Sequence, residues 1–353
     1  MDLEFIGLDV HASTSTICIL DARGNRVKTQ TIRGPIDRTI DVLRQRARTK
    51  ALVVCFEASL TYGTVHDRLS QFCRRVEVAH PGRLRLIFKS KRKNDRVDAQ
   101  KLAKLIFLDE VPTVHVPDLD VRGWRQLIET RHSAVAKRVR TKNALRAILR
   151  SLAIKAPFNL WTKQGRAWLS EVALPDAQAF KRDLLMHELA HFDQQVRLLE
   201  DRLDALVKSH PGCQLLLTIP GVGPRTAETM VAYIDDPHRF RKTRRIGAYF
   251  GLVPCQDASA GVNRLGHITK EGPASARKYL IEAAWQIVRR DDHYRQTYER
   301  IIAGKDDRKR IAIVAIAHKL ARTILAMLKS GETYRSPGPQ VKTQEQTMTK
   351  NAA

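Results

Sequence analysis

Residues 3–33 read LEFIGLDVHASTSTICILDARGNRVKTQTIR, and this stretch decides the fold class of the first third of the chain. FIGLDV is a short apolar run, and STICILD follows it with β-branched residues in alternation. DARGN then supplies the glycine and asparagine of a turn before RVKTQTI. Alternating runs separated by turn residues are typical of paired strands. The stretch therefore predicts consecutive antiparallel strands.

The segments after this stretch alternate between helical and strand-like patterns. Helical patterns occur at residues 38–47 and 64–75, and short apolar strands at residues 51–58 and 76–80. Three strands followed by helix, strand, helix, strand and helix is the element order of the ribonuclease-H-like fold. We therefore predict an α/β domain of this type over residues 1–112, ending near two closely spaced prolines.

The middle of the chain, residues 113–208, is predicted to hold two long helices. A basic helix fits residues 119–152, and a second helix fits residues 177–207. Apolar residues of the second helix are spaced alternately by four and three, a heptad seam typical of a coiled coil. The seam comprises Leu185, Leu189, Phe192, Val196, Leu199, Leu203 and Leu206. The two helices can pack as an antiparallel hairpin or pair with another protomer, and the sequence leaves both arrangements open.

The remainder divides into a mainly helical C-terminal domain and a polar tail. Helical patterns run through most of residues 209–330. Residues 331–353 have no hydrophobic pattern, so we predict that this tail is disordered.

The composition indicates a polyanionic partner. The formal net charge is +25, and Lys and Arg gain affinity by releasing counterions from phosphates. No apolar run approaches the ~20 residues that a membrane-spanning helix needs, and the acidic N-terminus is unlike a secretory signal. The five cysteines are scattered, which favours reduced thiols in a cytoplasmic protein. Nucleic acid is therefore the expected partner, and a membrane is not.

Four carboxylates stand at suggestive positions of the N-terminal domain. Asp9 ends the first strand, Glu57 ends a central apolar strand, and Asp95 and Asp98 are three residues apart on a helix. An acid at the end of an apolar strand is costly unless it has a partner, and Mg²⁺ is a natural one. The alternative is that each acid is a cap or a surface ion pair. The basic residues that precede this helix would guide a phosphate backbone: Lys91, Arg92 and Lys93.

A second candidate lies at residues 216–234, LLTIPGVGPRTAETMVAYI, which predicts a helix-hairpin-helix. Its turn would offer backbone N–H groups and a helix N-terminus to a phosphate, through Gly221, Gly223 and Arg225. An ordinary helix–helix turn is the alternative reading. Three cations just downstream favour phosphate contact: Arg241, Lys242 and Arg244.

Residues 251–272 form a glycine-rich segment that we expect to be an irregular loop. It contains Ser259, with Arg264 and Lys270 nearby, so a hydroxyl could reach a scissile phosphate beside cations. From residue types alone Ser259 is one serine among many.

HELAH, residues 187–191, matches the pattern of zinc proteases. Its two histidines fall opposite the heptad seam, so we interpret it as a chance match.

Three segments resemble the acidic motifs of the DEDD insertion-sequence transposases, the IS-one-ten family: GLDVHAST, CFEASLTYG and KNDRVDAQKLA. Three more resemble the C-terminal transposase domain of that family: LLTIPGVGPRTAETMVAYI, RIGAYFGLVP and ASAGVNRLGHITKEGPASARKYL. The resemblance covers about residues 4–330, in the order of the family.

The resemblance implies a RuvC-like domain whose tetrad of Asp9, Glu57, Asp95 and Asp98 binds Mg²⁺. It also implies a coiled-coil middle and a C-terminal domain with a nucleophilic serine, which falls on Ser259. Family members usually carry glycine directly after this serine and often serine in ISKxG, where this chain has Ala260 and Thr269.

The resemblance further implies DNA as substrate, a structured bridge RNA as guide, and a homo-oligomer, dimer or tetramer, with composite active sites. We therefore predict a DNA transposase that cuts and rejoins strands through a phosphoserine intermediate, in the cytoplasm of a bacterium and associated with the nucleoid. Two alternatives remain: a RuvC-type metal-dependent junction nuclease that uses water, and a non-catalytic nucleic-acid scaffold.

Overall fold

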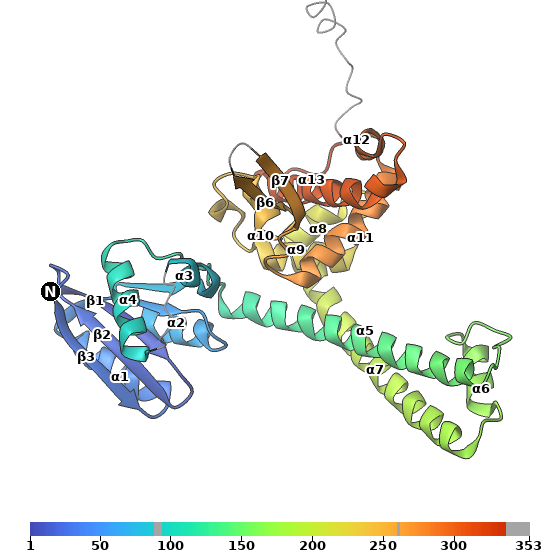
Figure 1. The fold of residues 1–353 in the computed structure, drawn as a ribbon, viewed down its shortest axis with the longest axis horizontal. Coiled ribbons are helices and arrows are strands. Elements are labelled where there is room, and N and C mark those ends of the chain that lie inside the picture. Colours follow the sequence, from blue (N-terminus) through green and yellow to red (C-terminus); the bar gives the residue numbers. More distant parts are fainter. Residues whose placement is uncertain (88–93, 260–261, 337–353) are drawn as a thin grey trace, which may run out of the picture. The chain divides into compact units, whose positions relative to one another are not determined.

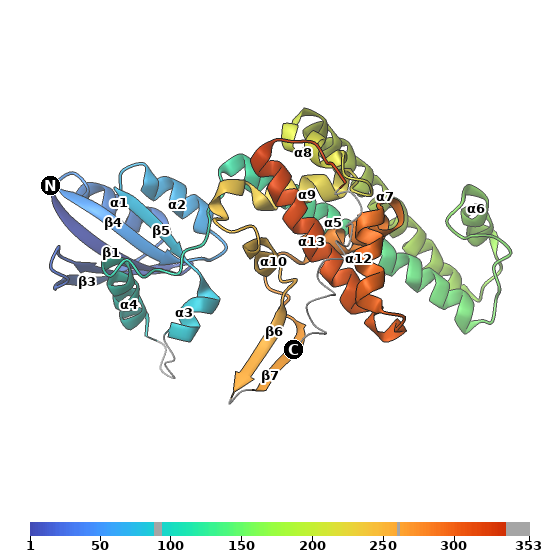
Figure 2. The ribbon, with the colours of Figure 1, turned by 90° about the horizontal axis from the view of Figure 1, so that it is seen from above.

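The computed structural model describes residues 1–87, 94–259 and 262–336. The chain divides into two compact units, Met1–Leu119 and Asp120–Ala353, drawn in two views in Figures 1 and 2. The first unit is a mixed α/β domain and the second is mostly helical, as predicted from the sequence.

The first unit is built on a five-stranded sheet with the order β3-β2-β1-β4-β5. Its strands are β1 (Asp2–Val10), β2 (Thr14–Leu20), β3 (Arg26–Arg33), β4 (Lys50–Glu57) and β5 (Arg75–Ala79). β1, β2 and β3 pair antiparallel, which confirms the prediction for residues 3–33. β4 runs parallel to β1, and β5 runs parallel to β4.

Helices cover both faces of this sheet (Figure 2). They are α1 (Ile36–Arg46), α2 (Tyr62–Ser70), α3 (Pro81–Ile87) and α4 (Asp95–Phe107). Because strand side chains alternate between faces, Ile6 and Leu8 of β1 are buried with α1 and α2. The face that carries Gly7 receives α4, since a Cβ on Gly7 would clash with the backbone of Ala99 and Ala103. The glycine therefore lets α4 rest directly on β1.

The second unit begins with two long helices, α5 (Leu119–Ser151) and α7 (Asp176–Ser209), with α6 (Lys163–Glu171) between them. Side chains bridge α5 and α7 along their length. Thr141 donates to Glu188 at 3.1 Å, and the Arg131 Nε donates to Glu200 at 2.9 Å. Of the two pairings that the sequence leaves open, α5 and α7 therefore form a hairpin within one chain. Four residues of the heptad seam are buried: Leu189, Phe192, Val196 and Leu203.

The other helices of this unit enclose one large apolar core. They are α8 (Pro211–Leu217), α9 (Pro224–Ile234), α10 (Arg245–Tyr249), α11 (Ala274–Arg290), α12 (Asp292–Ile302) and α13 (Lys309–Ser330), with short 3-10 turns at Pro237–Arg239 and Asp306–Arg308.

We expected no apolar run long enough to span a membrane, but one described segment has sufficient length and apolar composition. Residues Asp306–Ser330 reach a mean hydropathy of 1.8 over 18 residues, and half of that window is buried inside the unit. Leu320 and Ile324 of α13 lie in the core, which accounts for the apolar composition.

The glycine-rich segment 251–272 also differs from the irregular loop that we expected. It contains an antiparallel hairpin of β6 (Pro254–Ser259) and β7 (Val262–Ile268). Cys255 and Gln256 and the described side chains at 264–267 are exposed. Because backbone pairing rather than a buried face holds the strands together, an alternating apolar pattern is lacking.

The beginning of the polar tail contacts the helical core. Tyr334 donates its backbone N–H to Thr218 at 3.0 Å and its hydroxyl to Asp291 at 2.7 Å. Residues 337–353, the rest of the segment predicted to be disordered, lie outside the described residues.

Candidate metal centre and nucleic-acid contacts

Two parallel strands bring the first two acids to the same edge of the sheet. Leu8 of β1 is in register with Phe56 of β4, so Asp9 and Glu57 occupy the next positions of adjacent strands. Leu8 and Phe56, one position earlier on each strand, point into the core on one face of the sheet. Because strand side chains alternate between faces, Asp9 and Glu57 are on the other face, which α4 covers. Glu57 itself is exposed.

Helix α4 brings the second pair of acids. Asn94 caps its N-terminus, with the side chain accepting from the Arg96 N–H at 3.0 Å. Asp95 and Asp98 lie in the first turn, where the helix dipole favours negative charge. Asp98 also pairs with Lys101 at 3.2 Å.

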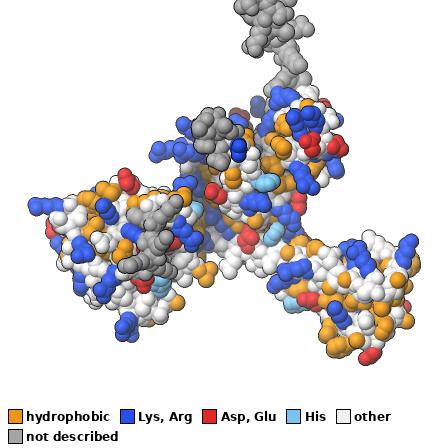
Figure 3. Space-filling model, in the orientation of Figure 1, with side chains coloured by type: hydrophobic (Ala, Val, Ile, Leu, Met, Phe, Trp, Pro, Cys, Tyr) orange, Lys and Arg blue, Asp and Glu red, His pale blue; other side chains and the backbone are white. Residues whose placement is uncertain are grey.

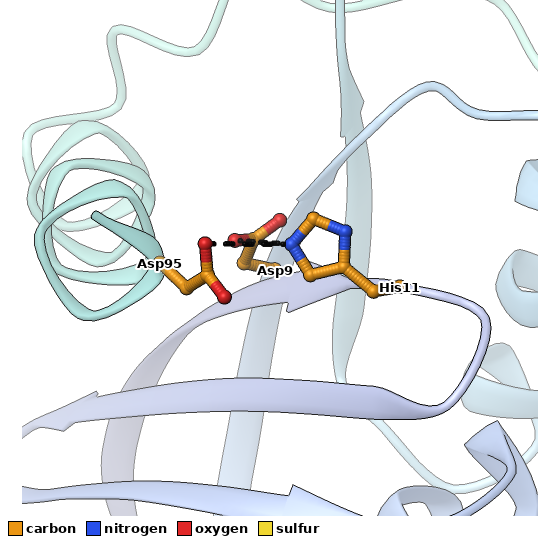
Figure 4. A group of neighbouring side chains, drawn as sticks. All are labelled: Asp9, His11 and Asp95. Carbon is orange, nitrogen blue, oxygen red and sulfur yellow. Dashed lines mark ion pairs between the residues drawn. The ribbon is translucent and has the colours of Figure 1, made fainter. Parts of the chain in front are cut away.

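Three side chains converge where α4 meets the end of β1 (Figure 4). The Nε2 of His11 lies 3.3 Å from an Asp9 oxygen and 3.6 Å from an Asp95 oxygen, and ligand atoms from all three lie within 4.8 Å of one another. Burial raises the pKa of Asp9, and the nearby charges of Asp95 and Asp98 raise it further, while His11 opposes the shift. The site therefore concentrates negative charge that a cation would neutralise.

His11 is a member of this cluster that the sequence reasoning missed. The signal was present, because His11 follows Asp9 by two positions and residues two apart on an extended strand face the same side. Its Nε2 is buried and has no hydrogen-bond partner of good geometry among the described residues, although both carboxylates are close. An imidazole nitrogen in this position is suited to ligate a cation.

The donor set fits a divalent metal ion. Carboxylate oxygens suit Mg²⁺ and Mn²⁺, whereas imidazole suits transition metals. Asp9, His11 and Asp95 form the one group of this kind found among the described residues. The structure therefore brings together two of the four predicted acids, places Asp98 close enough to affect the pKa of Asp9, and sets Glu57 on the neighbouring strand.

Comparison with known proteins places this site inside a recognised domain. A family model for the DEDD transposases of IS110 matches residues 6–154, and the model described as "Transposase IS116/IS110/IS902 family" matches residues 213–299. The chain belongs to this transposase family. Transposases of this family cut and join DNA, so the chain is an enzyme that acts on DNA.

The sequences of individual relatives align with nearly the whole chain. The transposase of insertion sequence element IS1111A from Coxiella burnetii is 27% identical over 95% of this chain and 92% of its own length. The transposase of insertion sequence element IS1328 from Yersinia enterocolitica is 24% identical over 94% of this chain and 99% of its own length.

Two helices, α8 and α9, with a short connection between them occupy the segment that we predict to be a helix-hairpin-helix. Gly221 adopts φ +92° and packs against the backbone of α11, where a Cβ would meet the Ile287 nitrogen at 2.9 Å. Gly223 caps α9 and has open space where a Cβ would be. The guanidinium of Arg225 pairs with Asp204 and lies 3.4 Å from Glu228, so in this structure acids already partner it.

The other predicted phosphate contacts of the transposase are exposed where they are described. Arg241, Lys242 and Arg244 precede α10, and none forms an ion pair within the described residues. Arg264 on β7 and Lys270 after it are also exposed. Lys91, Arg92 and Lys93 lie outside the described residues.

Ser259 is the last residue of β6 and is paired with Val262 of β7. The predicted nucleophile thus ends one strand of the hairpin, and its side chain lies outside the described part. HELAH lies on α7, where His187 and His191 are both exposed, and His191 contacts Gln195 at 2.9 Å.

Proposed function

We propose that this transposase cuts and rejoins the ends of an insertion sequence with a serine nucleophile and a carboxylate-held metal site. The observation that carries the proposal is the convergence of Asp9 and Asp95 around the Nε2 of His11. The strand order β3-β2-β1-β4-β5, with three antiparallel strands followed by two parallel ones, supports a RuvC-like, ribonuclease-H-like fold for this domain.

Asp9, Glu57, Asp95 and Asp98 would hold Mg²⁺, with His11 as a further ligand. A divalent ion bound there would polarise a phosphoryl oxygen and stabilise an attacking or leaving oxygen. The acids themselves would give the site its negative charge, and the pKa of Asp9 is raised first by burial and then by the charges of Asp95 and Asp98.

Ser259 would supply the nucleophile. Its Oγ would form a bond to the scissile phosphorus, the bond from phosphorus to the leaving deoxyribose oxygen would break, and that oxygen would take up a proton as the serine loses its own. The phosphoserine would keep the bond energy for rejoining, so no external energy source is required. Exposed Arg264, which lies two residues after the strand partner of Ser259, would stabilise the developing negative charge, whereas Lys270 lies beyond the opposite end of the hairpin.

The partners would be DNA at the element ends and target, together with a structured guide RNA. Gly221, Gly223, Arg225, Arg241, Lys242 and Arg244 would contact phosphates, and a net charge of +25 supports such contacts. Active assemblies would be dimers or tetramers in which the acidic domain of one subunit serves the serine of another, with coiled-coil helices contributing to assembly. We place the protein in the bacterial cytoplasm, associated with the nucleoid.

Ser259→Ala tests the proposal directly. The variant should lose the covalent protein–DNA adduct and strand transfer, detected by gel shift after denaturation, while Leu265→Ala on the neighbouring strand should keep both. A RuvC-type nuclease that uses water would keep cutting without Ser259. A non-catalytic scaffold would be unaffected by Asp9→Asn, which should abolish cleavage in the transposase.

A further inference from the structure

A compact group of four cations lies near the junction of α5, α6 and α7, and two of them lie over the ring of one tryptophan. We call it the arm cluster, and it consists of Arg138, Lys142, Arg146, Trp161, Arg166 and Asp193. Lys142 and Arg146 lie 4.8 and 5.0 Å from the centre of the Trp161 ring, within the range of cation–π attraction. Trp161 remains partly exposed. Lys and Arg side chains are also seen on the surface of the part that α5, α6 and α7 form, at the lower right of Figure 3.

The arm cluster contains more positively charged than negatively charged side chains. Arg166 pairs with Asp193 at 2.8 Å, and Arg138 approaches the same carboxylate at 3.5 Å. Asp193 is the single acid of the cluster, so its four cations are left with a local excess of about three charges.

Two further observations concern the pKa of Lys142 and the hydrogen bonding of Arg138. Burial lowers the pKa of Lys142, and repulsion from Arg138, Arg166 and Arg146 lowers it further against the opposing effect of Asp193. The Nε of Arg138 is buried without a hydrogen-bond partner among the described residues. An additional anion would stabilise the positive charges of this cluster.

We propose that the arm cluster binds an unpaired nucleic-acid strand, through phosphates on its cations and a base stacked near Trp161. This inference rests on the proposed function, because it assigns a surface to the nucleic acid that the transposase handles. Stacking on aromatic or guanidinium planes with phosphate contacts alongside is the chemistry of single-strand recognition. Base pairs within a duplex do not expose their faces, so the aromatic part of the cluster favours an unpaired segment.

A charge-matched pair of variants provides the test. Lys142→Gln/Arg146→Gln removes two cluster charges and keeps most of the side-chain length, whereas Arg140→Gln/Arg150→Gln removes two exposed charges of the same helix outside the cluster. Binding is measured against salt for a uridine-rich RNA of about 20 nucleotides, longer than one usual single-strand site, and for the equivalent DNA strand and its duplex.

The cluster variant should lower the slope of log K against log salt by about 1.4 on the single strands, since each lost contact contributes about 0.7. The control should change that slope by less than half as much. An equal loss on RNA and DNA supports the proposal, and a larger loss on RNA supports it and identifies RNA as the bound strand.

Equal effects of the two variants, or a loss confined to the duplex, overturn the inference. Arg146→Gln alone alters one exposed side chain and serves if the double variant unfolds. Asp9→Asn distinguishes a failure of the proposed function from a failure of this inference. Its expected loss of cleavage tests the proposed function, whether or not the arm cluster binds a strand.

Discussion

At the scale of single residues, His11 would give the proposed metal site a nitrogen ligand and so change its metal preference. We predict that His11→Ala weakens Mn²⁺ binding at least about tenfold, the effect seen when even an outer partner of a ligand is removed. Mg²⁺ binding should change less, because Mg²⁺ prefers oxygen ligands. Isothermal titration calorimetry with each ion measures both. His66→Ala on α2 is the control, and Mn²⁺ affinity that is unchanged in His11→Ala would refute the ligand role.

Glu228 is the second residue whose surroundings make a measurable prediction. Burial raises its pKa to about 7, although Arg225 and Arg131 oppose the shift. The folded chain therefore keeps this proton after the unfolded chain has released it near 4.5. The stability that the raised pKa contributes is complete below 4.5 and is lost as pH rises through about 7.

Glu228→Gln removes this titration and should flatten the pH dependence of stability. Between pH 5.5 and pH 8, wild type should lose about 2 kcal/mol more than the variant, since one pKa unit is about 1.4 kcal/mol. Chemical unfolding at the two pH values measures the difference. The exposed Glu299→Gln should follow wild type, and parallel pH profiles for wild type and Glu228→Gln would contradict the prediction.

At the scale of elements, the contact between α4 and β1 positions Asp95 next to Asp9. Gly7→Ala places a methyl group against the backbone of α4, so we expect a loss of about 1–3 kcal/mol, the usual cost of overpacking. Divalent-ion binding should weaken at the same time, because α4 carries Asp95. Thermal unfolding and ion titration check both effects.

Gly123→Ala is the matched control, since nothing lies within 4 Å of a Cβ at this position of α5. It should be neutral or raise stability by up to about 1 kcal/mol, because alanine favours a helix more than glycine does. If Gly7→Ala behaved in the same way, close packing of α4 on β1 would not be what assembles the site.

The same elements indicate what the sequence could and could not predict. β1, β2 and β4 were readable because one or both of their faces are buried, which imposes an apolar pattern. β6 and β7 were not, because their exposed side chains carry no such pattern. Asp9 and Asp95 were identified as acids in unusual places. The sequence shows His11 two positions after Asp9, but its approach to Asp95 depends on the placement of α4.

At the scale of the whole molecule, the candidate metal centre and the proposed serine belong to different compact units. Asp9 and Asp95 lie in Met1–Leu119, and Ser259 lies in Asp120–Ala353. A strand-transfer reaction needs both at one phosphate. Because symmetric oligomers repeat each surface, every subunit of an assembly could lend its acids to the serine of a neighbour.

Co-expression of Asp9→Asn with Ser259→Ala tests whether the active sites are shared in this way. Each variant alone should form no adduct. In a mixed dimer with shared sites, one site combines both intact residues, so random pairing should restore about a quarter of the wild-type adduct. If both residues came from one subunit, every site in the mixture would lack one of them. An absence of adduct in mixtures shown to contain mixed dimers would therefore place each active site within a single subunit.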